Sequence, residues 1–222
     1  SYSECEDDLN RICTDIENCA GDTSIALSMI SDDSFYMEMK KDYAPEMVTA
    51  FIRLNGATVG CVANRSEVYT DGEKTATYDA ALTAAGCEKA ATFVNFCNAF
   101  EIPVLTLVNV DGYKNCKCNE KKIAKAAARL TYAFANADVP KVTVVVGKAN
   151  GTAGLTMNSK SIGSDIVYAW KNAKIGVMEA APAVKIMYAD EIAKADNAAA
   201  LINEKAAQYN EMQASALAAA KR

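Results

Sequence analysis

Residues 141–155 decide the fold, and they read Lys141-Val-Thr-Val-Val-Val-Gly147-Lys-Ala-Asn-Gly151-Thr152-Ala153-Gly154-Leu155. The β-branched run over 142–146 is typical of a buried strand, and it ends in small residues that let backbone approach a ligand closely. A helix that opens at Gly151 leaves the N–H groups of Thr152 and Ala153 unpaired and pointing outward, which suits an oxyanion. Small residues at strand-to-helix corners also serve close packing alone, so both interpretations stay open for the residues by themselves.

Composition indicates a folded globular protein. The chain has 222 residues, of which 51% are hydrophobic and 23% charged, and this excludes the disordered and collagen-like classes. No stretch approaches the roughly 18 uninterrupted apolar residues of a membrane span, and residues 1–8 lack the basic and apolar blocks of a signal peptide. We therefore expect a cytoplasmic protein without stable membrane insertion, in which the eight cysteines are free and mostly buried thiols.

Charge and residue usage narrow the chemistry further. A net charge of −5 argues against nucleic acid as a partner. The Lys-rich segment 114–125 is the exception, and it reads as a solvated helix start or as a basic rim for an anionic ligand. The chain contains no histidine, which removes Ser-His and Cys-His pairs and every His-containing metal site. Catalysis must therefore use carboxylates, Lys, Tyr, Cys or backbone dipoles.

The order of apolar segments predicts a parallel layer. Asn55-Gly56 separates the apolar runs 47–54 and 57–63, which predicts a hairpin. Helices and strands are then expected to alternate: a helix over 80–100, a strand over 102–108, a helix over 119–137 capped by Asn119, a strand over 141–146 and a helix after Gly151. Two successive helix–strand units favour a parallel sheet.

The remaining segments complete this outline. We expect an amphipathic helix over 4–20, a polar surface excursion over 69–78, strands over 35–39, 165–170 and 174–178, a short helix over 180–189 and a long Ala-rich helix over 198–222. No linker rich in Pro, Gly or Ser interrupts the chain, which predicts a single domain over 1–222. Because the first residue is not Met and the last predicted helix has no capping turn, we expect a part of a longer polypeptide.

Three features resemble functional motifs but do not meet the requirements of those motifs. Cys116-x-Cys118 lacks the four ligands and the spacing of a structural zinc site, so no metal site is expected. The spacing Gly147-x₃-Gly151-x₂-Gly154 matches neither the phosphate loop nor the dinucleotide fingerprint. Glu179 follows a strand end, but a lone carboxylate is more often a solvated group than a general acid, and we assign it no role.

Three blocks together resemble one family. Arg53-Leu-Asn-Gly-Ala-Thr-Val-Gly-Cys-Val-Ala-Asn-Arg65 resembles the hairpin of the biotin-dependent carboxyltransferases, and residues 89–108 resemble the helix and strand that follow it. The most specific block runs from residue 128 to 149 and continues through Gly151-Thr-Ala153, Gly163-Ser-Asp165 and Ala169-Trp170. It is similar to the carboxyl-terminal half of that family, and the resemblance covers nearly the whole chain.

The resemblance implies an α/β crotonase-like (ClpP/crotonase) superhelix of β-β-α units. Residues 1–222 would form the carboxyl-terminal, biotin-facing carboxyltransferase domain, whereas an amino-terminal domain chiefly holds acyl-CoA. The active site of the family lies between such domains of opposite subunits. The implied partners are the amino-terminal domain, the biotin carboxyl carrier protein and further copies in a homo-oligomer.

The family's reaction moves CO₂ between carboxybiotin and the α-carbon of an acyl-CoA such as acetyl- or propionyl-CoA, in either direction. Both partners pass through enolate-like anions, which pairs of preorganised backbone N–H groups stabilise. By the resemblance, Thr152 and Ala153 correspond to the pair whose amides face the biotin ureido oxygen and are the catalytic pair. Gly151 and Gly154 flank them in the biotin and substrate site.

The resemblance assigns further residues to that site. Where the family often has Val-Asp-Val-Pro-Gly-Phe, this chain has Val108-Asn-Val-Asp-Gly112-Tyr113, and this loop is implied to border the biotin pocket through Gly112 and Tyr113. Leu155 suggests an apolar substrate pocket. One alternative from another class stays open, namely a non-catalytic assembly domain that dimerises or docks the biotin carrier, with the Ala-rich segment 198–222 as its interaction element.

Overall fold

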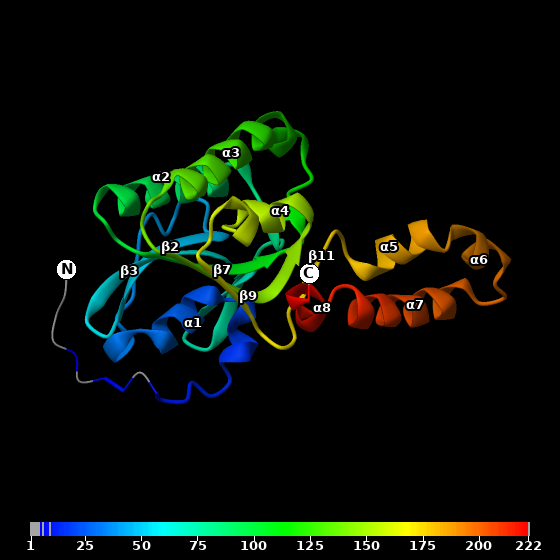
Figure 1. Cartoon of the computed structure of the whole chain (residues 1–222), viewed down its shortest axis with the longest axis horizontal. Helices are drawn as coiled ribbons and strands as arrows, with labels where there is room; N and C mark the ends of the chain where they lie inside the picture. The colour runs from blue at the N-terminus through cyan, green and yellow to red at the C-terminus, as the bar shows by residue number, and fades with distance from the viewer. Residues whose placement is uncertain (1–4, 6, 9, 222) are drawn as a thin grey trace.

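The computed structural model describes Cys5, residues 7–8 and residues 10–221. One twisted sheet forms the centre, with the strand order β1-β2-β3-β7-β9-β10 and with β11 also paired to β9 (Figure 1). Its strands are β1 (Met37–Glu38), β2 (Met47–Leu54), β3 (Ala57–Asn64), β7 (Val104–Val110), β9 (Lys141–Asn150), β10 (Ile166–Ala169) and β11 (Lys174–Gly176). Two small sheets pair β4 (Glu67–Thr70) with β5 (Glu73–Thr77) and β6 (Ala81–Leu82) with β8 (Gly112–Tyr113).

The predicted hairpin and parallel layer are confirmed. Strands β2 and β3 pair antiparallel around Asn55 and Gly56, whose φ angles of 50° and 76° fit the two-residue turn that matches the twist of the strands. Strands β3, β7 and β9 then run parallel to one another. Parallel neighbours need crossover connections, and α2 (Ala84–Ala99) and α3 (Lys117–Asn136) supply them.

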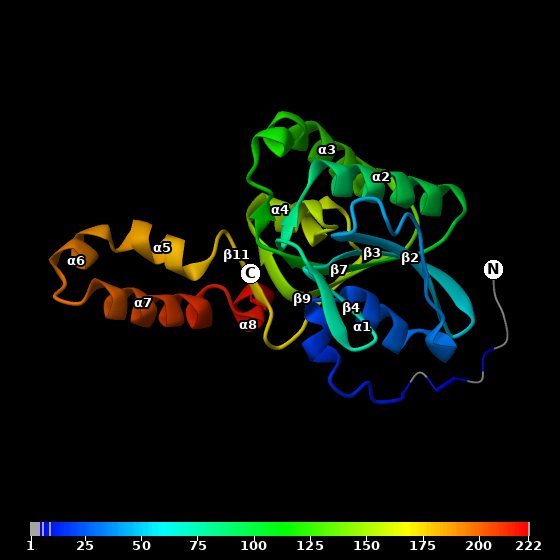
Figure 2. The ribbon, with the colours of Figure 1, turned by 180° about the vertical axis from the view of Figure 1, so that it is seen from behind.

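The helices cover the two faces of the sheet unequally. Helices α2 and α3 lie side by side on one face, while α1 (Thr23–Ile30) and the β4–β5 hairpin lie on the other (Figures 1 and 2). One buried apolar cluster lies under α2 and α3, and it includes Phe93, Leu130, Phe134 and Met157. A smaller cluster lies under α1 around Leu27 and Ile52. The chain therefore buries both faces of its parallel strands, as such strands require.

The C-terminal helices form an arm that extends away from the sheet (Figure 1). It contains α5 (Ala180–Met187), α6 (Ala189–Lys194) and α7 (Ala198–Met212), and α8 (Ala216–Ala220) then returns beside β11. The prediction of one helix over 198–222 is wrong because Ala214 is buried and its carbonyl accepts a hydrogen bond from Ile175 N at 2.8 Å. Ser215 then caps α8 through Ala218 N. The short helix predicted over 180–189 is confirmed as α5, which ends two residues earlier, and α6 is a separate helix that follows it.

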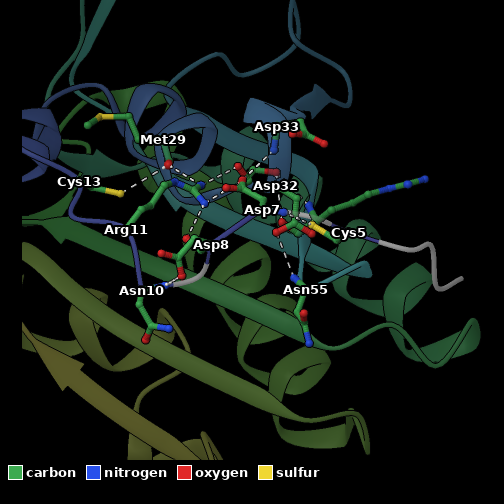
Figure 3. Close-up of polar contacts among 12 residues, drawn as sticks. Cys5, Asp7, Asp8, Asn10, Arg11, Cys13, Met29, Asp32, Asp33 and Asn55 are labelled. Atoms are coloured by element: carbon green, nitrogen blue, oxygen red, sulfur yellow. Dashed lines mark hydrogen bonds and ion pairs between the residues drawn. The ribbon is translucent and has the colours of Figure 1, made fainter.

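The predicted helix over residues 4–20 is wrong over its described residues, where only the 3-10 turn Ile16–Ala20 is helical. Residues 4, 6 and 9 lie outside the described residues. Arg11 explains the irregular path, because its guanidinium donates to the carbonyls of Met29 and Ser31 at 3.0 and 2.9 Å and pairs with Asp7 at 2.8 Å (Figure 3). These long-range contacts fix the segment against the end of α1 in place of helical backbone bonds.

Asn119 is not the helix cap that the sequence predicts. Helix α3 starts two residues earlier, with Cys116 at the cap position. The Asn119 side chain instead accepts a hydrogen bond from Ala84 N at 2.7 Å and donates to Lys114 O at 2.8 Å. It therefore joins the first turns of the two crossover helices. Helix α2 correspondingly begins at Ala84, capped by Thr83, and not at residue 80.

Within the part of the chain that the structure describes, none of the helices combines the length and the apolar character needed to cross a membrane.

Lys89 is an unusual core residue of α2, since its side chain is 2% exposed. Its ammonium donates to Ala44 O at 3.3 Å, near the buried ion pair of Arg65 and Glu38. Burial lowers the pKa of Lys89 from 10.5 to about 8, because a charged amine loses its hydration inside the protein. Lys89 therefore reduces stability at neutral pH.

We expect Lys89→Met to raise the free energy of unfolding at pH 7 by about 1–2 kcal/mol, since it removes the cost of a buried charge. Between pH 8 and 10.5 the unfolded wild-type chain binds the proton more tightly than the folded chain, so the wild-type stability rises with pH and the advantage of the variant shrinks. Urea unfolding at several pH values measures both effects, with Lys121→Met on the exposed face of α3 as the control. A pH-independent loss of stability in Lys89→Met would contradict this account.

Candidate functional site

The site is built on an irregularity in β9. Val108 of β7 pairs with Val145, but Val110 pairs with Ala149, so β9 carries two extra residues between these pairs. The Asn109 side chain fills the gap, where it accepts a hydrogen bond from Lys148 N at 3.1 Å and donates to Ala20 O at 2.8 Å. A Cβ at Gly147 would lie 2.3 Å from the Asn109 side chain, so this position needs glycine. The bulge sets which residues of β9 face the end of β7.

The corner after β9 forms where the sequence predicts it. Helix α4 (Gly151–Thr156) begins directly after Asn150, and Gly151 has a φ of +56°, a conformation that glycine adopts without strain. A Cβ at Gly154 would lie 2.7 Å from the carbonyl carbon of Ala149, so α4 packs directly against the backbone at the end of β9. Both glycines therefore also serve close packing, as the structural interpretation of this corner requires.

The start of α4 leaves hydrogen-bond donors uncapped. Asn150 occupies the position whose side chain usually accepts from the second and third N–H groups of a helix, here those of Thr152 and Ala153. Asn150 makes no such bond, and its amide nitrogen donates to Asp111 Oδ1 at 3.2 Å. Thr152 is exposed and Ala153 is buried. The two N–H groups can therefore bind an oxygen that approaches the corner.

The structure brings Gly112 and Tyr113 to the same corner. Both residues form β8, and the Tyr113 hydroxyl lies 3.1 Å from Thr156 Oγ1 on α4. Thr156 Oγ1 itself donates to Thr152 O at 2.9 Å, so Tyr113 is the donor to Thr156. No atom lies within 4 Å of a Cβ placed on Gly112, which leaves open space beside it. Leu155 is 47% exposed on α4.

A charged cluster beside the corner was not identified from the sequence. Lys148 Nζ lies 3.0 Å from Asp111 Oδ2 and also pairs with Glu179, which precedes α5. Burial lowers the pKa of Lys148, but its hydrogen bonds to Glu179 and Asp111 outweigh this and hold the pKa above its usual value. The hydrogen bond from Lys148 lowers the pKa of Glu179. The cluster therefore fixes the ends of β7 and β9 and the start of α5 around the corner.

The signal for this cluster in the sequence is weak. Asp111 directly follows β7, and the carboxyl ends of parallel strands meet at one edge of a sheet, which places it near the Gly151 corner. Lys148 and Glu179 lack such a signal because the bulge and the path after β11 determine where their side chains meet. Glu179 is thus an ion-paired group and not a solitary solvated carboxylate.

The described residues contain no group of three or more His, Cys, Asp or Glu side chains arranged to hold a metal ion.

Comparison with known proteins identifies the family. Residues 3–222 match the carboxyl transferase domain family. This chain belongs to that family. It is 38% identical over 218 residues to the propionyl-CoA carboxylase beta chain of Cereibacter sphaeroides, covering 98% of this chain and 40% of the relative. It is 39% identical over 189 residues to the methylmalonyl-CoA carboxyltransferase 12S subunit of Propionibacterium freudenreichii subsp. shermanii, covering 85% of this chain and 34% of the relative.

Solved structures agree with this assignment. A crystal structure of transcarboxylase 12S, described as a hexamer assembly with methylmalonyl-CoA and methylmalonic acid bound, is 36% identical and superposes with a TM-score of 0.87. The superposition covers all of this chain and 42% of that chain. The carboxyl transferase domain described here is therefore a mixed α/β domain of the same fold, and it spans 34–42% of the length of these relatives.

The Lys148–Glu179 pair can be tested by its pH dependence. We expect Glu179→Gln to lower the free energy of unfolding at pH 7 by less than about 1 kcal/mol, since the pair is half exposed. The folded-state pKa of Glu179 is lowered, so its contribution is present above the unfolded-state value near 4.5 and is lost as the pH falls through the folded-state value. Urea unfolding from pH 7 down to about pH 2 should show the wild-type and variant stabilities converging below pH 4.5. Glu204→Gln on α7 is the control, and a difference that persists at the lowest pH would contradict the assignment.

Proposed function

We propose that this chain is the carboxyl-terminal, biotin-facing domain of an acyl-CoA carboxyltransferase, with a crotonase-like fold. Its membership of the carboxyl transferase domain family and its match to only 34–42% of the relatives reported above support this proposal. The relatives are named for propionyl-CoA carboxylation, methylmalonyl-CoA carboxyl transfer and methylmalonyl-CoA decarboxylation, which favours a short-chain acyl-CoA as substrate. Carboxybiotin on a carrier protein supplies the CO₂ group.

The observation that carries the proposal is the uncapped start of α4. The N–H groups of Thr152 and Ala153 hold the ureido oxygen of biotin, because donors fixed in the folded state need no reorganisation when negative charge develops on that oxygen. Asn150 cannot compete for these donors, since it forms no side-chain cap on α4 and its amide nitrogen is bonded to Asp111. Backbone donors also need no titratable side chain, which fits a chain without histidine.

The neighbouring residues shape the pocket. Gly151 and Gly154 set the position of the corner, because a Cβ on either would meet the backbone of Val177 or Ala149. Gly112 leaves open space beside β8, and Tyr113 orients α4 through Thr156. Leu155 contributes an exposed apolar surface toward the acyl group.

The exposed surfaces favour an amino-terminal carboxyltransferase domain as partner. Strand β10 ends the sheet, and its residues Ile166, Val167 and Tyr168 are all exposed, although an apolar edge strand is usually covered. None of the 15 residues of α7 is buried. A second domain that covers these surfaces completes the site, and further copies build a homo-oligomer.

The exposed C-terminal arm also favours a second candidate function, a non-catalytic assembly domain for dimerisation or carrier docking. A titration of the ¹⁵N-labelled chain with biotin separates the two. Amide shifts at Thr152 and Ala153 that saturate with biotin support the carboxyltransferase domain. Dimerisation in sedimentation without any shift at the corner supports the assembly domain.

We expect the isolated chain to show no carboxyl transfer, because half a site lacks one pair of oxyanion donors and the thioester-binding surface. Loss of a single such donor already costs roughly 10²–10³ in rate. The assay is formation of malonyl-CoA or methylmalonyl-CoA from carboxylated free biotin, with a full-length relative as the positive control. Robust turnover by this chain alone would overturn the two-domain account.

Variants at the corner test the backbone mechanism in the enzyme reconstituted with an amino-terminal domain. Thr152→Ser retains the amide and should retain activity. Ala153→Pro removes one N–H and should cost about 3–4 kcal/mol of transition-state stabilisation. Ala153→Val also keeps the amide, but the Ala153 side chain is 1% exposed and belongs to the buried cluster under α2 and α3, so overpacking there should lower the melting temperature.

The melting temperature of each variant is measured first, since proline also perturbs backbone. A folded Ala153→Pro enzyme with near-normal turnover would show that the corner has only a packing role.

A further inference from the structure

Two cysteines face each other at the start of α3. Cys116 is half-buried at the cap position and Cys118 is exposed in the first turn, and their sulfur atoms lie 2.9 Å apart. Of the other six cysteines, Cys61, Cys87 and Cys97 are buried and Cys5, Cys13 and Cys19 are half-buried like Cys116, so Cys118 is the most exposed cysteine among the described residues. The expectation of mostly buried thiols therefore holds for only three of the eight.

The surroundings activate one sulfur of the pair. The hydrogen bond with the Cys118 thiol, the N–H of Asn119 and the nearby Lys114 ammonium lower the pKa of Cys116. The hydrogen bond with Cys116 raises the pKa of Cys118, so Cys116 is the more acidic thiol of the pair. Burial instead raises the pKa of Cys87 to about 12, which leaves that thiol inert at neutral pH.

We propose that Cys116 and Cys118 form a vicinal dithiol that reacts with low-molecular-weight disulfides, with Cys116 as the attacking sulfur and Cys118 as the resolving sulfur. The contact between the two sulfurs and the exposure of Cys118 carry this inference, which does not depend on carboxyl transfer.

The reaction balances in two exchange steps. The Cys116 thiolate attacks one sulfur of the small disulfide, forms a mixed disulfide and releases the first small thiolate, which takes a proton from solvent. Cys118 then loses its proton and attacks Cys116 Sγ, which displaces the second small thiol. The protein gives up two electrons and two protons in total, and the small disulfide is reduced to two thiols.

A disulfide between Cys116 and Cys118 would involve a residue that is hydrogen-bonded to the first turn of α3. It requires the sulfurs to move from 2.9 Å to about 2.05 Å, and Cys116 O accepts hydrogen bonds from the N–H groups of Asn119 and Glu120 at 3.0 Å each. Asn119 in turn holds Lys114, the residue after β8. A ring closed over a single intervening residue is constrained and exposed, so this disulfide should be readily reduced again.

The test uses the reduced chain and oxidised glutathione at pH 7. Intact-mass analysis of the wild type should show loss of two hydrogens with no glutathionyl group retained, and peptide mapping should join Cys116 to Cys118. Cys118→Ser should trap one glutathionyl group on Cys116. Cys116→Ser should react with oxidised glutathione at least about tenfold more slowly, because it lacks the attacking thiol. Cys19→Ser is the matched control and should behave as the wild type.

A second measurement guards against altered folding in the variants. Phenylarsine oxide binds paired thiols, so one equivalent should bind the wild type and Cys19→Ser, and neither Cys116→Ser nor Cys118→Ser should retain it. A wild-type chain that stays glutathionylated, a disulfide between other cysteines, or arsenical binding unaffected by either substitution would overturn the proposal.

Discussion

The bulge between β7 and β9 is the constraint on which the candidate site depends. In a regular parallel ladder the residues after Val108 and Val145 would continue pair by pair, and Asp111 would lie beside Lys148 along the backbone. The two extra residues of β9 instead pair Val110 with Ala149, which brings Asp111 to Asn150 and draws the Lys148 side chain between Asp111 and Glu179. The Asn109 amide makes this possible because it replaces the missing backbone partner of Lys148 N.

The bulge also explains the uncapped amides of α4. If Asn150 were free to turn toward the helix, its side chain would satisfy the N–H group of Thr152 or Ala153. Its bond to Asp111 therefore maintains a local deficit of hydrogen bonding, and Asp111 is itself held by Lys148. The close approach of Gly154 to Ala149 prevents α4 from shifting away. Unsatisfied donors in a native structure need an explanation, and the ligand proposed above supplies one.

The parts predicted from the sequence are those in which local pattern and tertiary structure agree. The Asn55-Gly56 turn, the β-branched strands and the small residues at the Gly151 corner each restrict the backbone within a few residues. Periodicity failed where distant groups provide the hydrogen bonds. Arg11 caps carbonyls of Met29 and Ser31 some twenty residues away, and Asn119 serves Ala84 rather than its own helix. The Lys148 cluster was missed for the same reason, since a bulge of two residues leaves no mark in the hydrophobic pattern.

The apolar side chains exposed on this chain give a physical reason why such a site would be shared between two domains. The sheet core is closed on both faces, yet β10 and the arm expose apolar side chains that the chain itself does not cover. Burying them against a second domain would release free energy roughly in proportion to the apolar area removed from water. On the proposed function, that domain would also cover the corner beside α4. In water, the N–H groups of Thr152 and Ala153 interact weakly with an oxyanion, because solvent competes for both groups and screens the charge. On the proposed function, association and electrostatic stabilisation are therefore coupled: the apolar surface would drive assembly, and the assembled domain would exclude the water that weakens the interaction of the two backbone amides with an oxyanion.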